Sequence, residues 1–189
     1  MRPSRGPGMS APPKDFAETP DQHADESSRR PGEFQPSLRA PNIATKMEEH
    51  KQPSPPQELS GYLDALARVM FQTGISWRVV EAKWPGTRDA FQGFKPDKVA
   101  AFSTADVDRL MGDTRVIRNR KKLEAVVANA RRMVEIEGDH GGFDRYLDSL
   151  GDFESTRTEL RKRFAFLGDS GVWFFLWMVG RKVPAHEHM

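Results

Sequence analysis

Apolar side chains recur at intervals of three and four residues through most of residues 57–189, which places them on one face of an α-helix. The pattern is clearest over 59–70 and 118–137, and in the second range the opposite face is charged. Shorter helical patterns cover these ranges: 77–84, 87–94, 96–102, 106–111, 143–150, 155–163 and 172–179. No stretch alternates convincingly as a β-strand would. The sequence therefore predicts an all-α fold, a compact bundle of about eight mostly short helices.

Several helix boundaries carry specific signals. Ser76 is a favourable N-cap for the helix that begins at Trp77. Pro85-Gly86 predicts a turn that ends this helix. Further along the chain, Ser103 and Asp106 have the spacing of a capping box, in which a side chain and a backbone N–H satisfy each other.

Composition changes at residue 56. Residues 1–56 contain eleven of the fourteen prolines but only twelve apolar side chains. Such a segment cannot bury enough surface to offset the entropy lost on ordering. We therefore predict that residues 1–56 are a disordered, proline-rich tail and that residues 57–189 are one folded domain. The tail could dock a protein partner, although a plain linker is the simpler interpretation.

The formal net charge is +2, and all of it belongs to residues 57–189, because the tail is balanced. So small a charge neither requires nor excludes a polyanionic partner, since clustering matters more than the sum. The absence of cysteine excludes disulfides, thiolate metal sites and cysteine nucleophiles. The longest apolar run, Val172 to Val179, is far shorter than the roughly 20 residues of a membrane span. We expect a soluble, cytoplasmic protein without a secretory signal.

The first candidate for chemistry is the segment around Gly168. A basic helix end at 161–163 leads towards a turn bounded by Gly168 and Gly171, and a helix begins near Ser170. Glycines allow a sharp turn and a close approach of a ligand to the backbone. The free N–H groups at a helix start suit a phosphate oxygen, although Asp169 opposes one. This layout is typical of a helix-hairpin-helix that binds a DNA backbone; an ordinary tight helix connection is the alternative.

A second candidate is a basic run that has no acidic residue between positions 114 and 123. Its members are Arg115, Arg118, Arg120, Lys121 and Lys122. At the start of a helix these charges oppose the helix dipole, so the helix itself gives no reason for them. Phosphate contacts would explain them, and a solvated helix face is the alternative. We take Arg118, Lys121 and Lys122 as candidates for binding the DNA backbone.

A third candidate is the segment Gly74-Ile75-Ser76-Trp77, a loop that enters a helix. An exposed isoleucine could wedge into a base stack while the neighbouring indole supports an extruded base. The alternative is that Ile75 and Trp77 both belong to the core. The remaining tryptophans, Trp84, Trp173 and Trp177, are better explained as core residues.

Acid–base and metal candidates are sparse. His186 and His188 form a His-x-His pair that could bind a metal, but a frayed chain end is the simpler interpretation. His140 lies in a glycine-rich turn and is expected on the surface. No Ser-His-Asp arrangement and no phosphate-binding loop of the Walker type is present, and we predict no cofactor.

Taken together, these segments resemble one family. The segment Phe71 to Val80, FQTGISWRVV, is similar to the Gln-x-Gly-Leu-Ser-Trp-x-x-Val segment of the DNA 3-methyladenine glycosylase I family. The similarity continues in the same order, within roughly residues 60–186, at 94–100, 106–111, 117–126, 129–131 and 161–168.

The resemblance implies a helix-hairpin-helix enzyme of base-excision repair, which flips an alkylated adenine out of the duplex and hydrolyses its N-glycosidic bond. It implies that Ile75 fills the gap in the duplex, that Trp77 stacks on the flipped base, and that Gly168–Gly171 grip a phosphate. An alkylated base already carries positive charge, which makes it a good leaving group. That charge also favours binding between aromatic faces.

The chain departs from the family pattern at two places. A family glutamate that hydrogen-bonds the alkylated base corresponds to Val69, so no catalytic carboxylate is assigned. The family's N-terminal block of zinc ligands and pocket aromatics has no counterpart in residues 1–56, and His186 is the one residue that could match a zinc ligand. We therefore expect no structural zinc.

Our leading hypothesis is a monomeric N-glycosylase that acts on double-stranded DNA with alkylated purines such as 3-methyladenine. The alternative is a non-catalytic DNA-binding module for damaged or bent duplex. A third possibility is a helical protein-interaction domain whose tail docks a partner.

Overall fold

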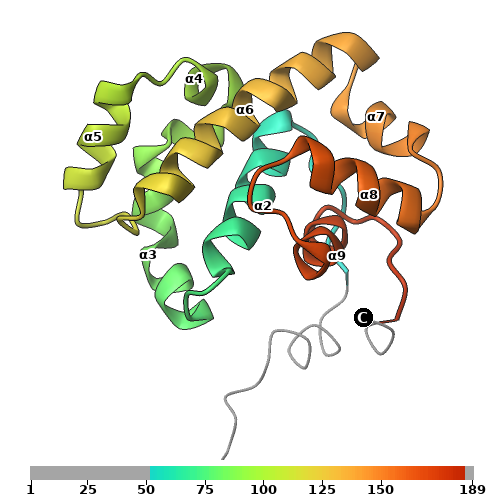
Figure 1. The fold of residues 1–189 in the computed structure, drawn as a ribbon, viewed down its shortest axis with the longest axis horizontal. Coiled ribbons are helices and arrows are strands. Elements are labelled where there is room, and N and C mark those ends of the chain that lie inside the picture. Colours follow the sequence, from blue (N-terminus) through green and yellow to red (C-terminus); the bar gives the residue numbers. More distant parts are fainter. Residues whose placement is uncertain (1–51, 186–189) are drawn as a thin grey trace, which may run out of the picture. The chain divides into compact units, whose positions relative to one another are not determined.

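The structure, a computed structural model, describes residues 52–185, and every regular element among them is helical (Figure 1). The all-α prediction is therefore confirmed. The elements are α2 (Leu59–Gln72), α3 (Trp77–Ala90), the 3-10 turn η1 (Gln92–Phe94), α4 (Pro96–Ala100), α5 (Thr104–Gly112), α6 (Arg120–His140), α7 (Phe143–Ser149), α8 (Phe153–Arg163) and α9 (Asp169–Met178). Most of the predicted tail lies outside the described residues, as do His186 and His188.

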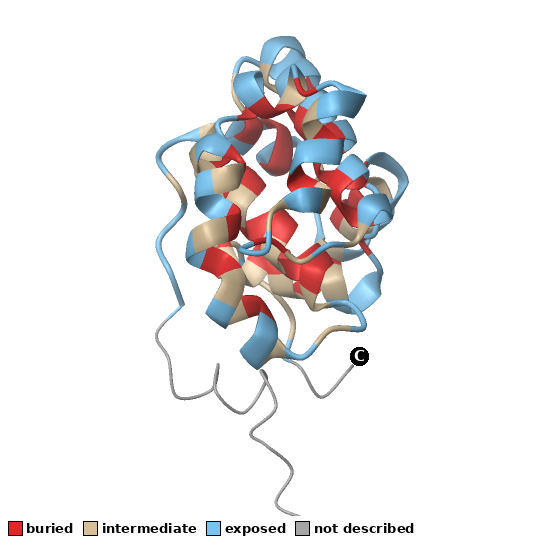
Figure 2. Cartoon of the chain, turned by 90° about the vertical axis from the view of Figure 1, so that its left-hand side faces the viewer, coloured by how far each residue is buried: buried red, intermediate tan, exposed pale blue. Residues whose placement is uncertain are grey.

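The long helix α6 runs through the middle of the arrangement and packs directly against α2, α4, α5 and α7 (Figure 1). One face of α6 carries a stripe of buried apolar side chains: Leu123, Val126, Val127, Ala130, Met133 and Ile136. The spacing of three and four residues is the one predicted. The last buried residue of the stripe is Ile136, whereas Val134 is exposed. Figure 2 shows the buried residues gathered between the helices and the exposed ones on their outer faces.

An aromatic cluster fills the space around the turn between α3 and α4. The rings of Phe91 and Phe94 stack with their centroids 5.2 Å apart, and Trp84 stacks on Phe94 at 5.4 Å. Phe102 lies against Phe91 at 5.9 Å. The backbone turns sharply here, because Gln92, Gly93 and Phe94 all have positive φ. Trp84 is thus a core residue, as the sequence predicted.

The helix α3 is longer than predicted, because Pro85-Gly86 is not a turn. Proline removes one helical hydrogen bond, but Thr87 is buried and its hydroxyl donates to the carbonyl oxygen of Lys83 at 2.9 Å. A Cβ on Gly86 would lie 2.6 Å from the Cβ of Arg115. Gly86 therefore permits a close approach of two chain segments, and tertiary packing carries the helix through the proline.

The predicted capping box at the start of α5 is present. The hydroxyl of Ser103 accepts a hydrogen bond from the backbone N–H of Asp106. The carboxylate of Asp106 accepts one from the backbone N–H of Ser103 at 2.8 Å. The bond from the backbone N–H of Ser103 and a second one, donated by the Ser103 hydroxyl to the same carboxylate, hold the pKa of Asp106 below its usual value. Ser76, in contrast, lies at the N-cap of α3 without a capping hydrogen bond from its side chain.

The last residues assigned to the tail by composition, 52–56, lie against the end of the helical bundle. The side-chain amide of Gln52 donates to the carbonyl oxygen of Arg181 at 2.6 Å. A Cβ on Gly180, which has a φ of 74°, would lie 2.8 Å from atoms of Pro53 and Pro55. The contacts of the helical domain thus include residues 52–56, which precede the predicted boundary at residue 57. No helix within residues 52–185 is long and apolar enough to cross a membrane.

Candidate nucleic-acid interface

Residues 73–76 connect α2 to α3. We call this connection the probing loop, after the role that the sequence predicts for Ile75. α2 ends at Gln72, and Gly74 takes a φ of 74°, a left-handed conformation that favours glycine. The backbone N–H of Ile75 donates to the carbonyl oxygen of Gln72 at 3.3 Å. The chain therefore reverses within four residues and α3 begins at Trp77.

The two probing side chains are neither free nor fully buried. Ile75 is half-buried and packs against the core. Trp77, in the first turn of α3, is half-buried as well. By contrast, Trp84 and Trp173 are buried, as predicted for core tryptophans, while Trp177 is half-buried. Trp77 and Ile75 thus keep part of their surface accessible beside a tight turn.

The predicted hairpin joins α8 to α9 through residues 164–168. Phe164 and Leu167 are buried and anchor it, whereas Phe166 between them is 44% exposed. The left-handed residue of this turn is Phe166, with a φ of 57°, and not one of the glycines. The φ of Gly168 is −82°, which any residue can adopt. The expectation that glycines make the sharp turn is therefore wrong for this hairpin.

The two hairpin glycines have other consequences. A Cβ on Gly168 would meet no atom within 4 Å, so this exposed residue leaves the start of α9 open. The first N–H groups of α9, which include that of exposed Ser170, have no partner within the helix. A Cβ on Gly171 would lie 3.3 Å from Leu167 and 3.4 Å from Val69. Gly171 therefore allows α2 to pack closely against the first turn of α9.

Asp169, the acidic residue of the hairpin, is paired with two arginines of α8. Its carboxylate lies 2.9 Å from the guanidinium of Arg161 and 3.5 Å from that of Arg157. The carboxylate also stands at the N-terminus of α9, where the helix dipole favours negative charge. Asp169 is thus compensated by these arginines, and Lys162 adds a positive charge beside the hairpin.

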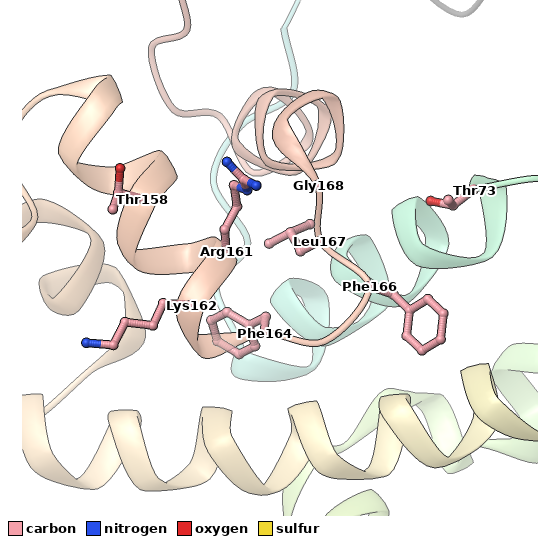
Figure 3. Close-up of a pocket in the computed structure, with 8 residues that line it drawn as sticks. All are labelled: Thr73, Thr158, Arg161, Lys162, Phe164, Phe166, Leu167 and Gly168. Carbon is pink, nitrogen blue, oxygen red and sulfur yellow. The ribbon is translucent and has the colours of Figure 1, made fainter.

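An open pocket of about 650 Å³ lies between the hairpin and the end of α2 (Figure 3). Thr73 lines it from α2, and Arg161 and Lys162 line it from α8. Figure 3 shows Phe166 projecting away from the hairpin on the side of Thr73, while Phe164 is turned inwards. The pocket therefore joins the probing loop and the hairpin on one basic, partly aromatic surface.

The basic run at the start of α6 divides into three groups. Arg115 pairs with Asp113 at 2.8 Å, and Arg120 pairs with Asp108. Lys122 is buried, with its ammonium group turned inwards. Within residues 52–185, no carboxylate pairs with Arg118 or Lys121, and both are exposed. This corrects the placement of Lys122 among the surface cations and leaves Arg118 and Lys121 as the accessible ones.

Lys122 contacts the end of α2. Its ammonium group donates to the carbonyl oxygen of Phe71 at 3.3 Å and also to that of Thr73. The side chain is 5% exposed, and burial lowers the pKa of its ammonium group. A cation at the C-terminus of a helix is favoured by the helix dipole. The ammonium group of Lys122 is thus directed from the start of α6 to the end of α2.

Asn129 is a functional candidate that the sequence reasoning missed. It lies within the buried face of α6, and its side-chain oxygen accepts from the backbone N–H of Ala165 at 2.8 Å. Its amide nitrogen donates to the carbonyl oxygen of Ala165 at 3.2 Å. An amide side chain inside an otherwise apolar stripe was a visible signal, because a buried polar group needs partners.

Val69 and the histidines complete the predicted set. Val69 is 4% exposed on α2 and lies beside Gly171 at the start of α9. The position that corresponds to the family's glutamate is therefore buried and apolar. His140 is exposed and its ring lies edge-on against Tyr146 at 4.9 Å. Among residues 52–185, no group of three or more acidic or histidine side chains could hold a metal ion. His186 lies outside the described residues.

Known proteins are similar to this chain in both sequence and fold. The family model of methyladenine glycosylases matches residues 55–176. The chain is 32% identical to a DNA-3-methyladenine glycosylase of Haemophilus influenzae over 130 residues, which are 58% of this chain and 70% of that protein. It is 42% identical to DNA-3-methyladenine glycosylase 1 of Escherichia coli over 66 residues, 35% of each chain.

Solved structures agree. The structure of 3-methyladenine DNA glycosylase I from Staphylococcus aureus, which addresses recognition of 3-methyladenine, superposes with a TM-score of 0.62. The identity is 28%, over 75% of this chain and 87% of that one. A variant of 3-methyladenine DNA glycosylase I in complex with 3-methyladenine gives the same TM-score and identity, over 75% of this chain and 88% of that one. With its helical fold and its extensive match to the family model, the chain belongs to the methyladenine glycosylase family.

Proposed function

We propose that this protein is a base-excision repair glycosylase that removes alkylated purines of the 3-methyladenine class from double-stranded DNA. The observation that carries the proposal is the joint position of two elements in a chain of this family. Thr73, the first residue of the probing loop, lines one pocket with the hairpin, and Arg161 and Lys162 add positive charge to it; Ile75 and Trp77 follow Thr73 within four residues. A surface that combines loop-borne apolar side chains with a phosphate-binding turn suits a protein that extrudes a base while it holds the backbone.

In this proposal each element has one role. Ile75 enters the gap that the extruded base leaves, and Trp77 stacks on that base. The N–H groups of Gly168–Gly171, together with Arg118 and Lys121, hold phosphates of the DNA backbone. The accessible surface of Ile75 and Trp77 beside the sharp turn at Gly74 supports these roles.

The reaction that follows is a hydrolysis. The bond between the sugar C1′ and the base nitrogen breaks, and its electron pair neutralises the positive charge of the alkylated base. A water oxygen forms the new bond to C1′ and loses one proton to solvent. Because the leaving base is already cationic, the reaction requires less acid–base assistance than most hydrolyses do. Stacking on Trp77 stabilises the cationic base in the site.

The apolar wall at Val69 favours a second candidate function, a non-catalytic module that binds damaged or bent duplex. Val69 is buried against the start of α9, at the position where the family resemblance implies a carboxylate. A module of this kind would bind DNA in a salt-dependent manner without releasing a base. For the glycosylase, the same residue implies that the base is recognised by stacking and shape.

Base release distinguishes the two functions. The full chain is incubated with duplex DNA that has been treated with a methylating agent, and the free bases are separated by chromatography. We expect free 3-methyladenine to accumulate with time in proportion to the protein added. A folded protein that binds the duplex but releases no base would contradict the glycosylase proposal and support the binding module.

Backbone binding has its own prediction. Replacing Arg118 or Lys121 with alanine is expected to weaken duplex binding and to reduce the slope of log K against log salt by about 1 for each residue. The matched control is Arg115→Ala in the same basic run, because Arg115 is already paired with Asp113. Slopes for Arg118→Ala and Lys121→Ala equal to that of the wild type, measured by fluorescence anisotropy, would remove these two residues from the interface.

We further propose that the protein acts as a monomer in the cytoplasm, and that the proline-rich segment up to residue 51 forms a separate tail that is available to a protein partner. The composition of the tail supports this division of the chain.

A further inference from the structure

Two buried polar side chains of α6 hold the two loops that the proposed function brings to DNA. Lys122 contacts the probing loop, and Asn129 contacts the hairpin. We propose that Lys122 and Asn129 are positioning residues, which fix the distance and orientation between the base-probing loop and the backbone-binding hairpin. The inference rests on the proposed function for its consequences on DNA, but the mechanical part concerns the free protein.

The contacts of Lys122 lie directly before the probing side chains. Its ammonium group donates to the carbonyl oxygens of Phe71 and Thr73, the last turn and the C-cap of α2. Thr73 is two residues before Ile75 and four before Trp77. Because Gly74 is conformationally permissive, a fixed carbonyl at Thr73 limits the directions in which Ile75 can point.

The contacts of Asn129 lie within the hairpin. Its side chain binds both backbone groups of Ala165, one as acceptor and one as donor. Ala165 directly precedes Phe166, the residue with left-handed backbone and an exposed ring. Two hydrogen bonds to a single residue fix both its position and its rotation, so this turn is held at its strained point.

Lys122 and Asn129 lie on the same face of one helix, α6. Lys122 and Asn129 are seven residues apart on one helix, which is two turns, so they lie on the same face about 10 Å apart along the axis. A helix of this length is stiff, and its apolar stripe is packed on both sides of these residues. Both loops are therefore attached to the same rigid helix, and neither can shift without breaking its hydrogen bonds to α6.

A purely stabilising role does not explain Lys122. Lys122 as a whole residue is 5% exposed, its ammonium group donates to two backbone carbonyl oxygens, and no carboxylate within residues 52–185 pairs with it. Burial of an unpaired charge is costly, and an apolar side chain of similar size often gives equal or greater stability. The benefit of this lysine is the geometry of the loop that it holds.

The test compares two variants, each of which is the control for the other. Lys122→Met and Asn129→Leu keep the volume of the side chain but remove the hydrogen bonds. Hydrogen exchange of the free, full-length protein is followed by mass spectrometry. We expect Lys122→Met to accelerate exchange in residues 73–76 but not in 164–168, and Asn129→Leu to do the reverse. Acceleration of both segments in both variants, or of neither, would overturn the proposal.

The consequences on DNA separate in the same way. Lys122→Met is expected to lower the single-turnover rate of base release by about tenfold or more, because a misplaced probing loop loses the productive geometry. Its affinity for a duplex with a stable abasic-site analogue is expected to stay near that of the wild type. Asn129→Leu is expected to weaken that affinity by roughly tenfold. The same loss of affinity in both variants would contradict separate roles.

A conservative variant guards against misfolding as the cause. Lys122→Arg keeps a cationic donor, so it is expected to restore most of the rate that Lys122→Met loses, at comparable thermal stability. If Lys122→Arg releases base as slowly as Lys122→Met while folding normally, the hydrogen bonds to the probing loop are not the reason for the loss. A wild-type protein that releases no base would refute the proposed function, and the exchange experiment would still decide the positioning roles.

Discussion

Replacing Trp77 with alanine is expected to reduce the rate of base release from methylated DNA by about tenfold to a hundredfold, the range that loss of one base-stacking aromatic produces. Trp77 begins α3 directly after the probing loop, and part of its indole remains accessible. Because Val69, at the position of the family's base-contacting glutamate, is buried and apolar, we expect the stacking face to be the main source of affinity for the extruded base. Rates are measured under single-turnover conditions with chromatographic detection of the free base.

Two further variants make this prediction specific. Trp77→Phe keeps an aromatic face and is expected to retain most of the activity. Trp177→Phe changes another half-buried tryptophan, in α9, and is expected to leave base release close to the wild-type rate. Unchanged release by folded Trp77→Ala would refute the stacking role of this residue, whatever the activity of the protein.

The second large effect is on stability. Replacing Phe91 with alanine is expected to lower the free energy of unfolding by about 3–5 kcal/mol, the cost of removing a large aromatic side chain from a close-packed core. Phe91 is fully buried, and its ring stacks on those of Phe94 and Phe102. Since small domains are stable by only about 5–15 kcal/mol in total, this single change removes a large part of the margin. Urea unfolding followed by circular dichroism measures it.

The matched control for Phe91→Ala is Val134→Ala, an apolar truncation on the exposed side of α6. Val134 is 39% exposed, so its loss is expected to change the unfolding free energy by no more than about 0.5 kcal/mol. If both variants lose the same small amount, the aromatic cluster between α3 and α4 is not the packing centre that the stacked rings indicate.

Periodicity and capping chemistry were sufficient to predict most of the helices. The apolar stripe of α6 and the capping box of Ser103 and Asp106 depend on residues three and four apart, so the sequence contains the whole interaction. The continuation of α3 through Pro85 could not be predicted in this way. It depends on the burial of Thr87 and on the approach of Arg115, which lies 29 positions after Gly86.

The candidate site shows the same limit. Its probing residues and hairpin could be located, because each lies within one short segment with a helix start beside it. The direction of Lys122 could not, since its partners Phe71 and Thr73 lie about 50 positions earlier in the chain. The sequence also predicted that glycines would make the sharp turn of the hairpin, because local preference places positive φ at glycine. Phe166, which lies between the buried residues Phe164 and Leu167, has a positive φ that local preference disfavours.

The contact between Gln52 and Arg181 has a topological consequence. It joins the first and the last parts of the described chain, so the helices between them form a ring that is closed by hydrogen bonds instead of a covalent link. The two neighbours of this closure are α2 and α9, which carry the probing loop and the end of the hairpin. This link adds to the direct packing of α2 against the first turn of α9 at Gly171. The working unit of the protein therefore includes residues 52–56, although composition assigns them to the tail.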